Sequence, residues 1–219
     1  MIITIDGPAK SGKSRAAELL AAKLGFAYLN TGAMYRAAGL AFRESGWLQE
    51  VADIRQAASI QQFVDAIHFE MTERVVLNGK DLTDQIQTLD AGNAASVIGT
   101  YQPLREKLKA EQRRIAAGRD IICEGRDQGT SVFPNAEIKF YVTASPAVRA
   151  ERMAKTMPGT PDLIALAAVI ATRDERDSTR TFDPLKPATD AIAIDTSNLS
   201  AERVVEFMNG VVDKWRSKG

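Results

Sequence analysis

The segment GPAKSGKS, residues 7–14, lies directly behind the apolar run IITI near the start of the chain. It fits the pattern of a glycine, four free positions and then Gly-Lys-Ser, with Gly7, Gly12, Lys13 and Ser14 at the required places. In such a loop the backbone N–H groups point inward at one anion, the lysine adds charge for the outer phosphates, and the hydroxyl can bind Mg²⁺. The segment therefore predicts a phosphate-binding loop.

The flanks of this loop favour the same interpretation. A short strand pattern over 2–6 precedes it, and a helical pattern over 14–24 follows it and ends at Gly25, a residue typical of a helix C-cap. The alternative is an unrelated glycine-rich turn between a strand and a helix. With both flanks in place we expect nucleotide binding.

Strand and helix patterns alternate along the chain. The runs typical of strands are 2–6, 120–124, 138–143 and 191–195, and the helical patterns are 14–24, 32–44, 103–117, 146–157, 161–180 and 200–218. This order predicts an α/β fold with a mainly parallel sheet and helices on both faces. Ligands of such sheets bind at the carboxyl ends of the strands.

One stretch, IHFEMTERVVLNGKDLTDQIQT (67–88), breaks this alternation. It indicates two or three antiparallel strands, with Asn78-Gly79 as a two-residue hairpin turn. We expect a β-rich insert over about 63–90 at the edge of the parallel core. His68, the one histidine, lies within it, and we expect it to have a structural or surface role.

Composition limits the classes of function. The 28 basic and 28 acidic side chains cancel, so we expect no nucleic-acid partner, and an anion site must come from locally clustered arginines. The 219 residues suit one α/β domain with an inserted subdomain. The single cysteine, Cys123, excludes an internal disulfide and fits a reducing cytoplasm, as a small buried strand residue. No apolar run approaches the roughly 18 residues that span a bilayer, and we expect no targeting segment before the first strand.

The segment TRDERDSTR spaces Arg173, Asp177 and Arg180 at i, i+4 and i+7, so a helix would present them on one face. Such a face can be a solvated surface braced by ion pairs. Three further arginines, Arg36, Arg105 and Arg126, favour a substrate that carries its own phosphate. Arg126 and Asp127 are the most telling, because they follow the carboxyl end of a predicted strand.

A family resemblance covers almost the whole chain in order. It rests on the segments IDGPAKSGKS, LNTGAMYRAAGLA, GNAAS, ICEGRDQGTSVFPNAEIKFYVTAS, TRDERDSTR and PLKPATDAIAIDTSNLS. Together they resemble the bacterial cytidylate kinases, which phosphorylate CMP. The resemblance implies a nucleoside monophosphate kinase fold with a phosphate-binding loop, a single kinase domain over 1–219, a CMP-binding region over about 31–118 and a short lid over about 149–161.

The resemblance also implies a role for each matching residue. ATP would contact Gly7, Pro8, Ala9, Lys10, Ser11, Gly12, Lys13, Ser14, Arg149 and Arg152, with Mg²⁺ at Ser14. CMP or dCMP would contact Thr31, Arg36, Ser96, Arg105, Arg126, Asp127, Arg173, Asp177 and Arg180. Within these sets, the residues that serve the transferred phosphoryl group are Lys13, Arg36, Arg126 and Arg173. Asp177 would reach the ribose, and the cytosine would be read by Ser96, Arg105, Asp127 and Arg180.

Three positions depart from the family pattern. A lysine, Lys10, stands where the family often has a small residue, Arg15 replaces a usual threonine, and Asn30 replaces a common aspartate. Lys10 either points to solvent or adds charge to the donor site. Arg15 begins the helix and should be harmless. The function of the carboxylate that Asn30 replaces is left open.

The expected chemistry is direct in-line transfer, with no catalytic nucleophile, no essential histidine and no metal other than Mg²⁺ brought by the nucleotide. The family's enzymes are generally monomeric. Two other functions stay open: a nucleotide-dependent switch or regulatory ATPase, and a kinase for a different small acceptor. Stimulation of ATP consumption by CMP, and a panel of acceptors, would separate them.

Overall fold

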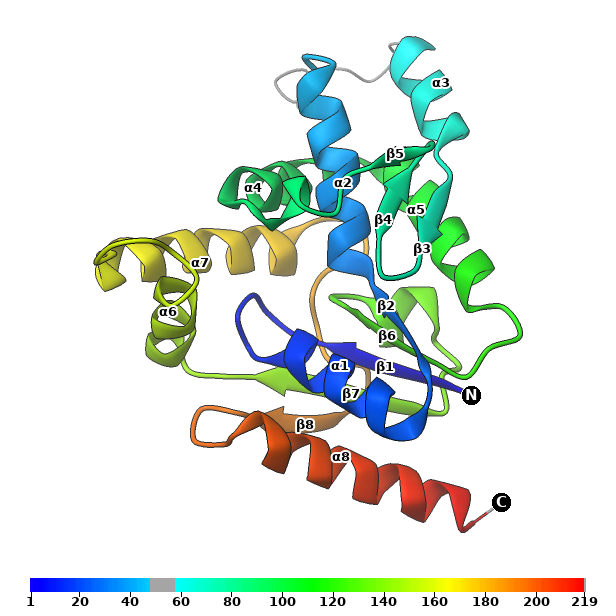
Figure 1. Ribbon diagram of the computed structural model, residues 1–219, viewed down its shortest axis with the longest axis vertical. Coiled ribbons are helices and arrows are strands. Elements are labelled where there is room, and N and C mark those ends of the chain that lie inside the picture. Colours follow the sequence, from blue (N-terminus) through cyan, green and yellow to red (C-terminus); the bar gives the residue numbers. More distant parts are fainter. Residues whose placement is uncertain (48–57, 219) are drawn as a thin grey trace. The chain divides into compact units, whose positions relative to one another are not determined.

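The computed structural model describes residues 1–47 and 58–218, and the chain divides into two compact units (Figure 1). The core unit comprises Met1–Tyr28 and Gly118–Gly219, and the inserted unit comprises Leu29–Ala117. Each unit is described by itself. The predicted functional regions, 31–118 and 149–161, remain predictions.

The core unit is built on a five-stranded sheet in the order β2-β6-β1-β7-β8. The strands are β1 (Ile2–Asp6), β2 (Ala27–Asn30), β6 (Ile121–Gly125), β7 (Ile138–Thr143) and β8 (Ile192–Asp195), and the chain passes into the inserted unit within β2. Strand β1 pairs in parallel with β6 and β7, and β7 pairs in parallel with β8. The predicted parallel α/β sheet is confirmed. Strand β2 was not predicted.

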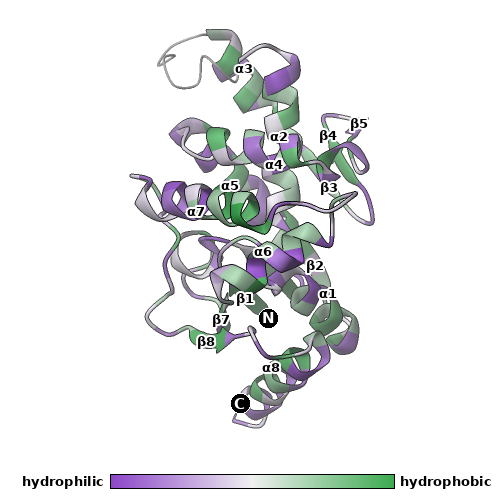
Figure 2. Cartoon of the chain, turned by 90° about the vertical axis from the view of Figure 1, so that its left-hand side faces the viewer, coloured by the Kyte–Doolittle hydropathy of each residue, from purple (hydrophilic) through white to green (hydrophobic). Residues whose placement is uncertain are grey.

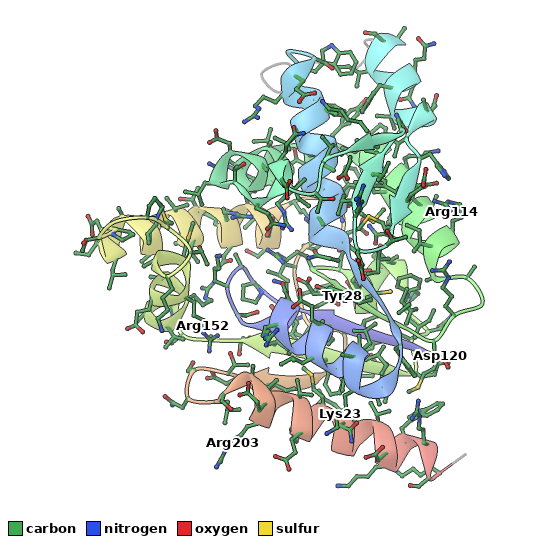
Figure 3. All side chains as sticks on the ribbon, in the orientation of Figure 1. Lys23, Tyr28, Arg114, Asp120, Arg152 and Arg203 are labelled. Atoms are coloured by element: carbon green, nitrogen blue, oxygen red, sulfur yellow. The ribbon has the colours of Figure 1, made fainter. Side chains whose placement is uncertain are left out.

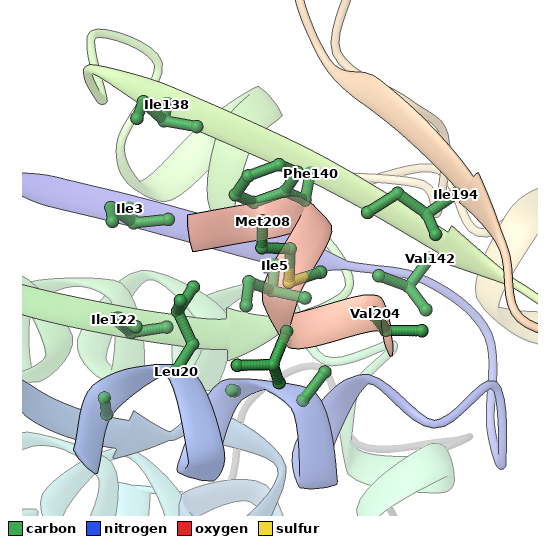
Figure 4. Packing of buried hydrophobic residues seen from close by; sticks show 14 of the residues in the cluster. Ile3, Ile5, Leu20, Ile122, Ile138, Phe140, Val142, Ile194, Val204 and Met208 are labelled. Carbon is green, nitrogen blue, oxygen red and sulfur yellow. The ribbon is translucent and has the colours of Figure 1, made fainter. Parts of the chain in front are cut away.

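The hydrophobic core of this unit lies between the sheet and two helices, α1 (Lys13–Leu24) and α8 (Ala201–Arg216). Side chains alternate along β1, and Ile3 and Ile5 pack with Leu20 of α1 and Met208 of α8 (Figure 4). Apolar and polar residues alternate turn by turn along α8 (Figure 2), as expected of a helix that buries one face and exposes the other. This packing fixes β1, and with it the start of the phosphate-binding loop.

The intervening residues of β1, Thr4 and Asp6, lie against a short π-helix, η2 (Gln128–Val132). A Cβ on Gly129 would come within 2.9 Å of the Thr4 hydroxyl oxygen, so only glycine lets η2 approach β1 so closely. Two further helices, α6 (Pro146–Ala154) and α7 (Leu163–Thr179), pack on each other through a small apolar cluster. Helix α7 ends at Thr179, one residue before the predicted end.

The inserted unit combines helices with a small sheet. Its helices are α2 (Thr31–Glu44), α3 (Ala58–Ala66), α4 (Leu89–Ile98), α5 (Gln102–Ala116) and the 3-10 turn η1 (Gln85–Gln87). Helices α2 and α4 touch backbone to backbone, since a Cβ on Gly39 would lie 2.8 Å from the nitrogen of Ala95. Phe42, Trp47 and Phe63 form a cluster of edge-on rings with centroids 5.5 to 5.7 Å apart.

The expected antiparallel strands are present as β3 (Phe69–Met71), β4 (Val75–Leu77) and β5 (Lys80–Asp81). The turn between β4 and β5 is the predicted Asn78-Gly79, with φ angles of 49° and 79°. Two consecutive positive φ angles are typical of the turn that matches the twist of a hairpin. Across the described residues, no helix is both long and apolar enough to span a membrane.

Candidate active site

The phosphate-binding loop connects β1 to α1 and is shaped by two glycines. A Cβ on Gly7 would lie 2.0 Å from the carbonyl oxygen of Val142 on β7, so any larger residue would push the loop off the sheet. Gly12 has a φ of 92° and is the N-cap of α1, where no side chain caps the helix. The N-terminal N–H groups of a helix attract an anion, which suits a phosphate at this loop.

The side chain of Lys13 is buried beneath this loop. Its Nζ donates a hydrogen bond to the carbonyl oxygen of Pro8 at 3.0 Å and lies 3.5 Å from Oε1 of Glu124 at the end of β6. Burial and the neighbouring charge of Arg126 lower the pKa of Lys13 to about 7, against the opposing effect of Glu124. Tyr28 donates a hydrogen bond to the other carboxylate oxygen of Glu124 at 3.0 Å. The sequence analysis missed Glu124, although it lies only two residues before the predicted Arg126 at a strand's carboxyl end.

A second buried carboxylate, Asp6, also escaped the sequence analysis. Its two oxygens accept hydrogen bonds from the backbone N–H groups of Gln128 and Gly129, at 2.9 and 2.7 Å. Burial raises the pKa of Asp6 to about 7 in spite of these hydrogen bonds. Asp6 therefore connects the start of the phosphate-binding loop to the segment that follows Arg126 and Asp127.

Four predicted site residues form one ion-pair network. Arg126 Nε donates to Oδ2 of Asp177 at 3.0 Å. Arg180 approaches Asp177 at 4.0 Å and Asp127 at 3.8 Å. Burial opposes the charge on Arg126, but the carboxylates of Asp177 and Glu124 outweigh it and raise the pKa of Arg126. The network alternates positive and negative groups, as buried charges require.

The helical-face expectation needs one correction. Arg173 and Asp177 lie one turn apart on α7, but Arg180 is the C-cap of that helix, with non-helical backbone angles of −60° and 144°. Its side chain reaches Asp177 and Asp127 because the chain turns after Thr179 and not because of the helical repeat. Asp177 and the Arg180 side chain are both largely buried, so the face is not a solvated ion-pair surface.

Arg149 and Arg152 of α6, predicted at the lid, contact the phosphate-binding loop itself. Arg149 donates to the carbonyl oxygen of Ala9 at 3.3 Å and is paired with Asp174 of α7. Arg152, labelled in Figure 3, donates to the hydroxyl and carbonyl oxygens of Thr196 at 2.9 and 2.8 Å. The Thr196 hydroxyl donates in turn to the carbonyl oxygen of Ser11 at 2.7 Å. Thr196 was not predicted, because no sequence pattern links it to a loop 185 positions away.

The departures from the family pattern at Lys10 and Asn30 have local structural roles. Lys10 has a left-handed φ of 60°, and its Nζ lies 3.2 Å from the Thr156 hydroxyl oxygen, so it does not extend freely into solvent. Asn30 is the N-cap of α2, and its side-chain oxygen accepts a hydrogen bond from the N–H of Ala33 at 3.0 Å. A neutral amide can therefore do the capping work of a carboxylate there.

The other predicted CMP-binding residues belong to the inserted unit. Thr31 and Arg36 lie on α2, Ser96 on α4 and Arg105 on α5. Arg105 is 1% exposed, donates to the carbonyl oxygen of Gly99 at 3.1 Å and lies over the ring of Tyr35 at 5.6 Å. The roles of these residues stay predictions.

Two residues with possible catalytic chemistry lie outside these networks. The His68 side chain is 56% exposed and lies 3.6 Å from Glu111. Cys123 is buried in β6, and burial raises the pKa of its thiol far above its ordinary value. His68 is on the surface of the inserted unit and Cys123 is buried in a strand, so neither position suits a catalytic nucleophile. Within 1–47 and 58–218, no group of three or more His, Cys, Asp or Glu side chains could hold a metal.

The chain matches a family model described as cytidylate kinase over residues 3–214. The chain belongs to the cytidylate kinase family. A cytidylate kinase of Fervidobacterium nodosum is 42% identical over 96% of this chain and 95% of the relative. One from Chlorobaculum tepidum is 38% identical over 98% and 93%. These relatives match nearly the whole chain, so family membership covers both units.

Solved structures with low sequence identity share the fold. An uncharacterized protein from Eubacterium ventriosum superposes with a TM-score of 0.56 at 12% identity, over 97% of this chain and 98% of that chain. A shikimate kinase from Bacteroides thetaiotaomicron gives a TM-score of 0.50 at 10% identity, with the same coverage. The chain therefore has the fold of a phosphate-binding-loop kinase.

Proposed function

We propose that this protein transfers the γ-phosphoryl group of ATP directly to the phosphate of CMP, and also to that of dCMP. The observation that carries the proposal is the network of Arg126, Asp177, Arg180 and Asp127 in the same unit as the buried Lys13. The sequences of the family supply the substrate class. The buried charges supply groups that can hold phosphate and read a base.

The donor half of the reaction uses the phosphate-binding loop. Backbone N–H groups at the start of α1 and the ammonium of Lys13 would bind the ATP phosphates, and Arg149 and Arg152 contact the carbonyl groups of the same loop. The Ser14 hydroxyl, in the first turn of α1, is an oxygen ligand that fits Mg²⁺ carried by the nucleotide. Such a metal neutralises phosphate charge when it is bound.

The transfer itself needs no covalent intermediate on the protein. A bond forms between an oxygen of the CMP phosphate and the γ-phosphorus as the bond to the β-phosphate oxygen breaks. Lys13, Arg36, Arg126 and Arg173 would stabilise the charge on the moving group, and the segment 149–161 would exclude water as a lid. We propose that one copy of the chain suffices.

Base choice follows from the hydrogen-bonding capacity of two side chains. An ionised Asp127 only accepts, which suits the exocyclic amino group of cytosine, and Arg180 only donates, which suits the ring nitrogen. Uracil presents a carbonyl and an N–H at these places, so both contacts would be mismatched. Ser96 and Arg105 would complete the base site, and Asp177 would serve the ribose. Each mismatch costs about 1 to 3 kcal/mol, so the expected preference for CMP is roughly 30-fold or more.

The test is a coupled assay of ATP turnover with CMP, dCMP, UMP and AMP, followed by the variant Asp127→Asn. We expect CMP to stimulate ATP consumption strongly, which a switch or regulatory ATPase would not show. The amide can turn its NH₂ group toward uracil, so the CMP to UMP preference should fall by at least about tenfold. A preference within about threefold of wild type would remove Asp127 from the base site.

A further inference from the structure

Asp183, in the loop between α7 and β8, has an unusual backbone conformation. Its φ is 49°, in the left-handed region that residues other than glycine, asparagine and aspartate rarely adopt. Strained residues of this kind persist only where surrounding contacts hold them. Asp183 has such contacts through both its backbone and its side chain.

The backbone of Asp183 holds the guanidinium group of Arg180. The carbonyl oxygen of Asp183 accepts a hydrogen bond from Nε at 2.8 Å and a second from Nη2 of the same arginine. One edge of the planar guanidinium is therefore fixed against the loop, and Nη2 lies 3.8 Å from Oδ2 of Asp127. The residue with the left-handed φ is therefore the one whose carbonyl oxygen holds Arg180.

The side chain of Asp183 extends the same connection to Asp127. Its Oδ1 accepts a hydrogen bond from the Ser131 hydroxyl at 2.6 Å. The backbone N–H of Ser131 donates to the carbonyl oxygen of Asp127 at 2.9 Å. The path from Asp127 through Ser131, Asp183 and Arg180 back to Asp127 is thus a closed ring within the core unit.

We propose that Ser131 and Asp183 form a clasp that sets the spacing between Asp127 and Arg180, and so act as positioning residues for base selection. The inference rests on the proposed function, because it takes Asp127 and Arg180 as the groups that read the base. The Ser131 and Asp183 side chains need not touch the substrate. They act by fixing an acceptor and a donor at the separation that matches one pyrimidine edge.

The chemistry of the two clasp residues suggests variants that separate contact from conformation. Asp183→Asn keeps a side-chain oxygen for Ser131 and tolerates the left-handed backbone. Asp183→Gly keeps the backbone conformation and removes the tether. Ser131→Ala removes the tether from the other side without changing residue 183. Asn78→Ala is the matched control, because Asn78 also has a φ of 49° but lies in the β4–β5 hairpin of the inserted unit.

The experiment compares kcat/KM for CMP and UMP in these variants, with the KM for ATP as an internal reference. We expect Ser131→Ala and Asp183→Gly each to reduce the CMP to UMP preference by at least threefold, chiefly through the KM for CMP. The double variant should lose no more than either single one, since both break the same bond. Asp183→Asn and Asn78→Ala should keep the wild-type preference.

Two results would overturn the clasp. One is a preference within about 1.5-fold of wild type in both Ser131→Ala and Asp183→Gly. The other is an Asp183→Asn variant that loses as much preference as Asp183→Gly, which would mean that the hydrogen bond to Ser131 is not what matters. Failure of the proposed function is distinguishable, because the wild-type protein itself would then show no preference for CMP.

Discussion

The two units hold their largely buried arginines in different ways. In the core unit, Arg126 is paired with Asp177, 51 positions away in the sequence, and Asp177 is shared with Arg180. In the inserted unit, Arg105 donates to the carbonyl oxygen of Gly99, only six positions away, and lies over the ring of Tyr35. Charge in the core unit is thus balanced by distant carboxylates that several residues share.

This difference predicts how far the effect of a substitution spreads. Removal of one shared carboxylate in the core unit leaves two arginines without that partner, and both are proposed to bind substrate. Removal of Arg105 takes away a hydrogen bond to the carbonyl oxygen of Gly99 and a contact with the ring of Tyr35. We therefore expect removal of Asp177 to change several kinetic parameters at once and removal of Arg105 to change few.

The largest expected effect belongs to Lys13→Ala. The variant should fold, but turnover should fall by about 100-fold or more, because the lost ammonium stabilises charge that develops in the transition state. Steady-state kinetics would measure the turnover, and circular dichroism would show whether the variant is folded. Lys23→Ala, on the last turn of the same helix, is the control and should keep full turnover. A Lys13→Ala variant with more than about a tenth of wild-type turnover would mean that the loop is not the active site.

The next largest effect is expected for Asp177→Ala. We expect a loss of about 2 kcal/mol or more in the free energy of unfolding, since breaking a buried ion pair leaves uncompensated charge, reduced here by partial solvent exposure. The KM for CMP should rise and turnover should fall, because Arg126 and Arg180 both lose a partner. Denaturant unfolding and kinetics provide the measurements.

Arg105→Met is the comparison for Asp177→Ala. It should raise the KM for CMP with little change in turnover, as expected of a residue that binds the base and not the phosphoryl group. If Asp177→Ala altered only one parameter, or if Arg105→Met altered turnover as strongly, the contrast between the two units would be wrong.

One carboxylate in each unit should contribute to the pH dependence of stability with opposite sign. Burial raises the pKa of Asp6 to about 7, so the folded core unit retains a proton between about pH 4 and 7 that the unfolded chain has lost. Its contribution to the free energy of unfolding therefore falls as pH rises through that window. In the inserted unit, burial opposes the charge on Glu111, but hydrogen bonds from Arg114 and from the N–H of Phe69 outweigh it and lower its pKa. Stability from Glu111 is lost as pH falls through the acid range.

The measurement is the free energy of unfolding from pH 3 to 8 in Asp6→Asn and Glu111→Gln. In the wild type, the contribution of Asp6 to the free energy of unfolding should decline by up to about 1.4 kcal/mol for each unit that the pH rises between about pH 4 and 7. Asp6→Asn should remove this decline. Glu111→Gln should instead flatten the loss below about pH 4.5. Parallel profiles for the two variants would contradict the assignment.

The smallest effect is expected for Lys10→Gly. Glycine relieves the left-handed strain at φ 60° but gives the unfolded chain more freedom, and each contribution is about 1 kcal/mol or less. The free energy of unfolding should change by less than about 1 kcal/mol, and loss of the contact with Thr156 should leave the KM for ATP within about twofold. A larger kinetic effect would give Lys10 a direct part in donor binding.

Regular, strongly patterned elements could be predicted from the sequence. Two predicted strands, 2–6 and 138–143, match β1 and β7 at both ends, because short segments rich in β-branched and aromatic residues mark strands buried in a parallel sheet. Strand β2 was missed because it has only four residues, of which Leu29 alone is buried. Helix α4 was missed because its sequence shows no clear amphipathic period. Several of its residues are small, which permits the close contact with Gly39.

The site divides along a similar line. The phosphate-binding loop and the arginines stand in motifs, so the sequence alone can point to them. Glu124, Asp6 and Thr196 also lie within the quoted family segments, but their contacts could not be predicted, because each is made with a partner that folding brings from a distant part of the chain. The end of α7 is another example, since the backbone of Arg180 leaves the helix that its sequence pattern continues.

The bond between the Thr196 hydroxyl and the Ser11 carbonyl has a consequence for biosynthesis. A ribosome makes the phosphate-binding loop well before Arg149, Arg152 and Thr196, which fasten it, because Thr196 lies 185 positions after Ser11. At about 5 to 20 residues per second, the loop waits on the order of ten seconds or more for these partners. During translation it is therefore a nascent segment without its final anchors, and ATP should gain its full affinity only after residue 196 has left the exit tunnel.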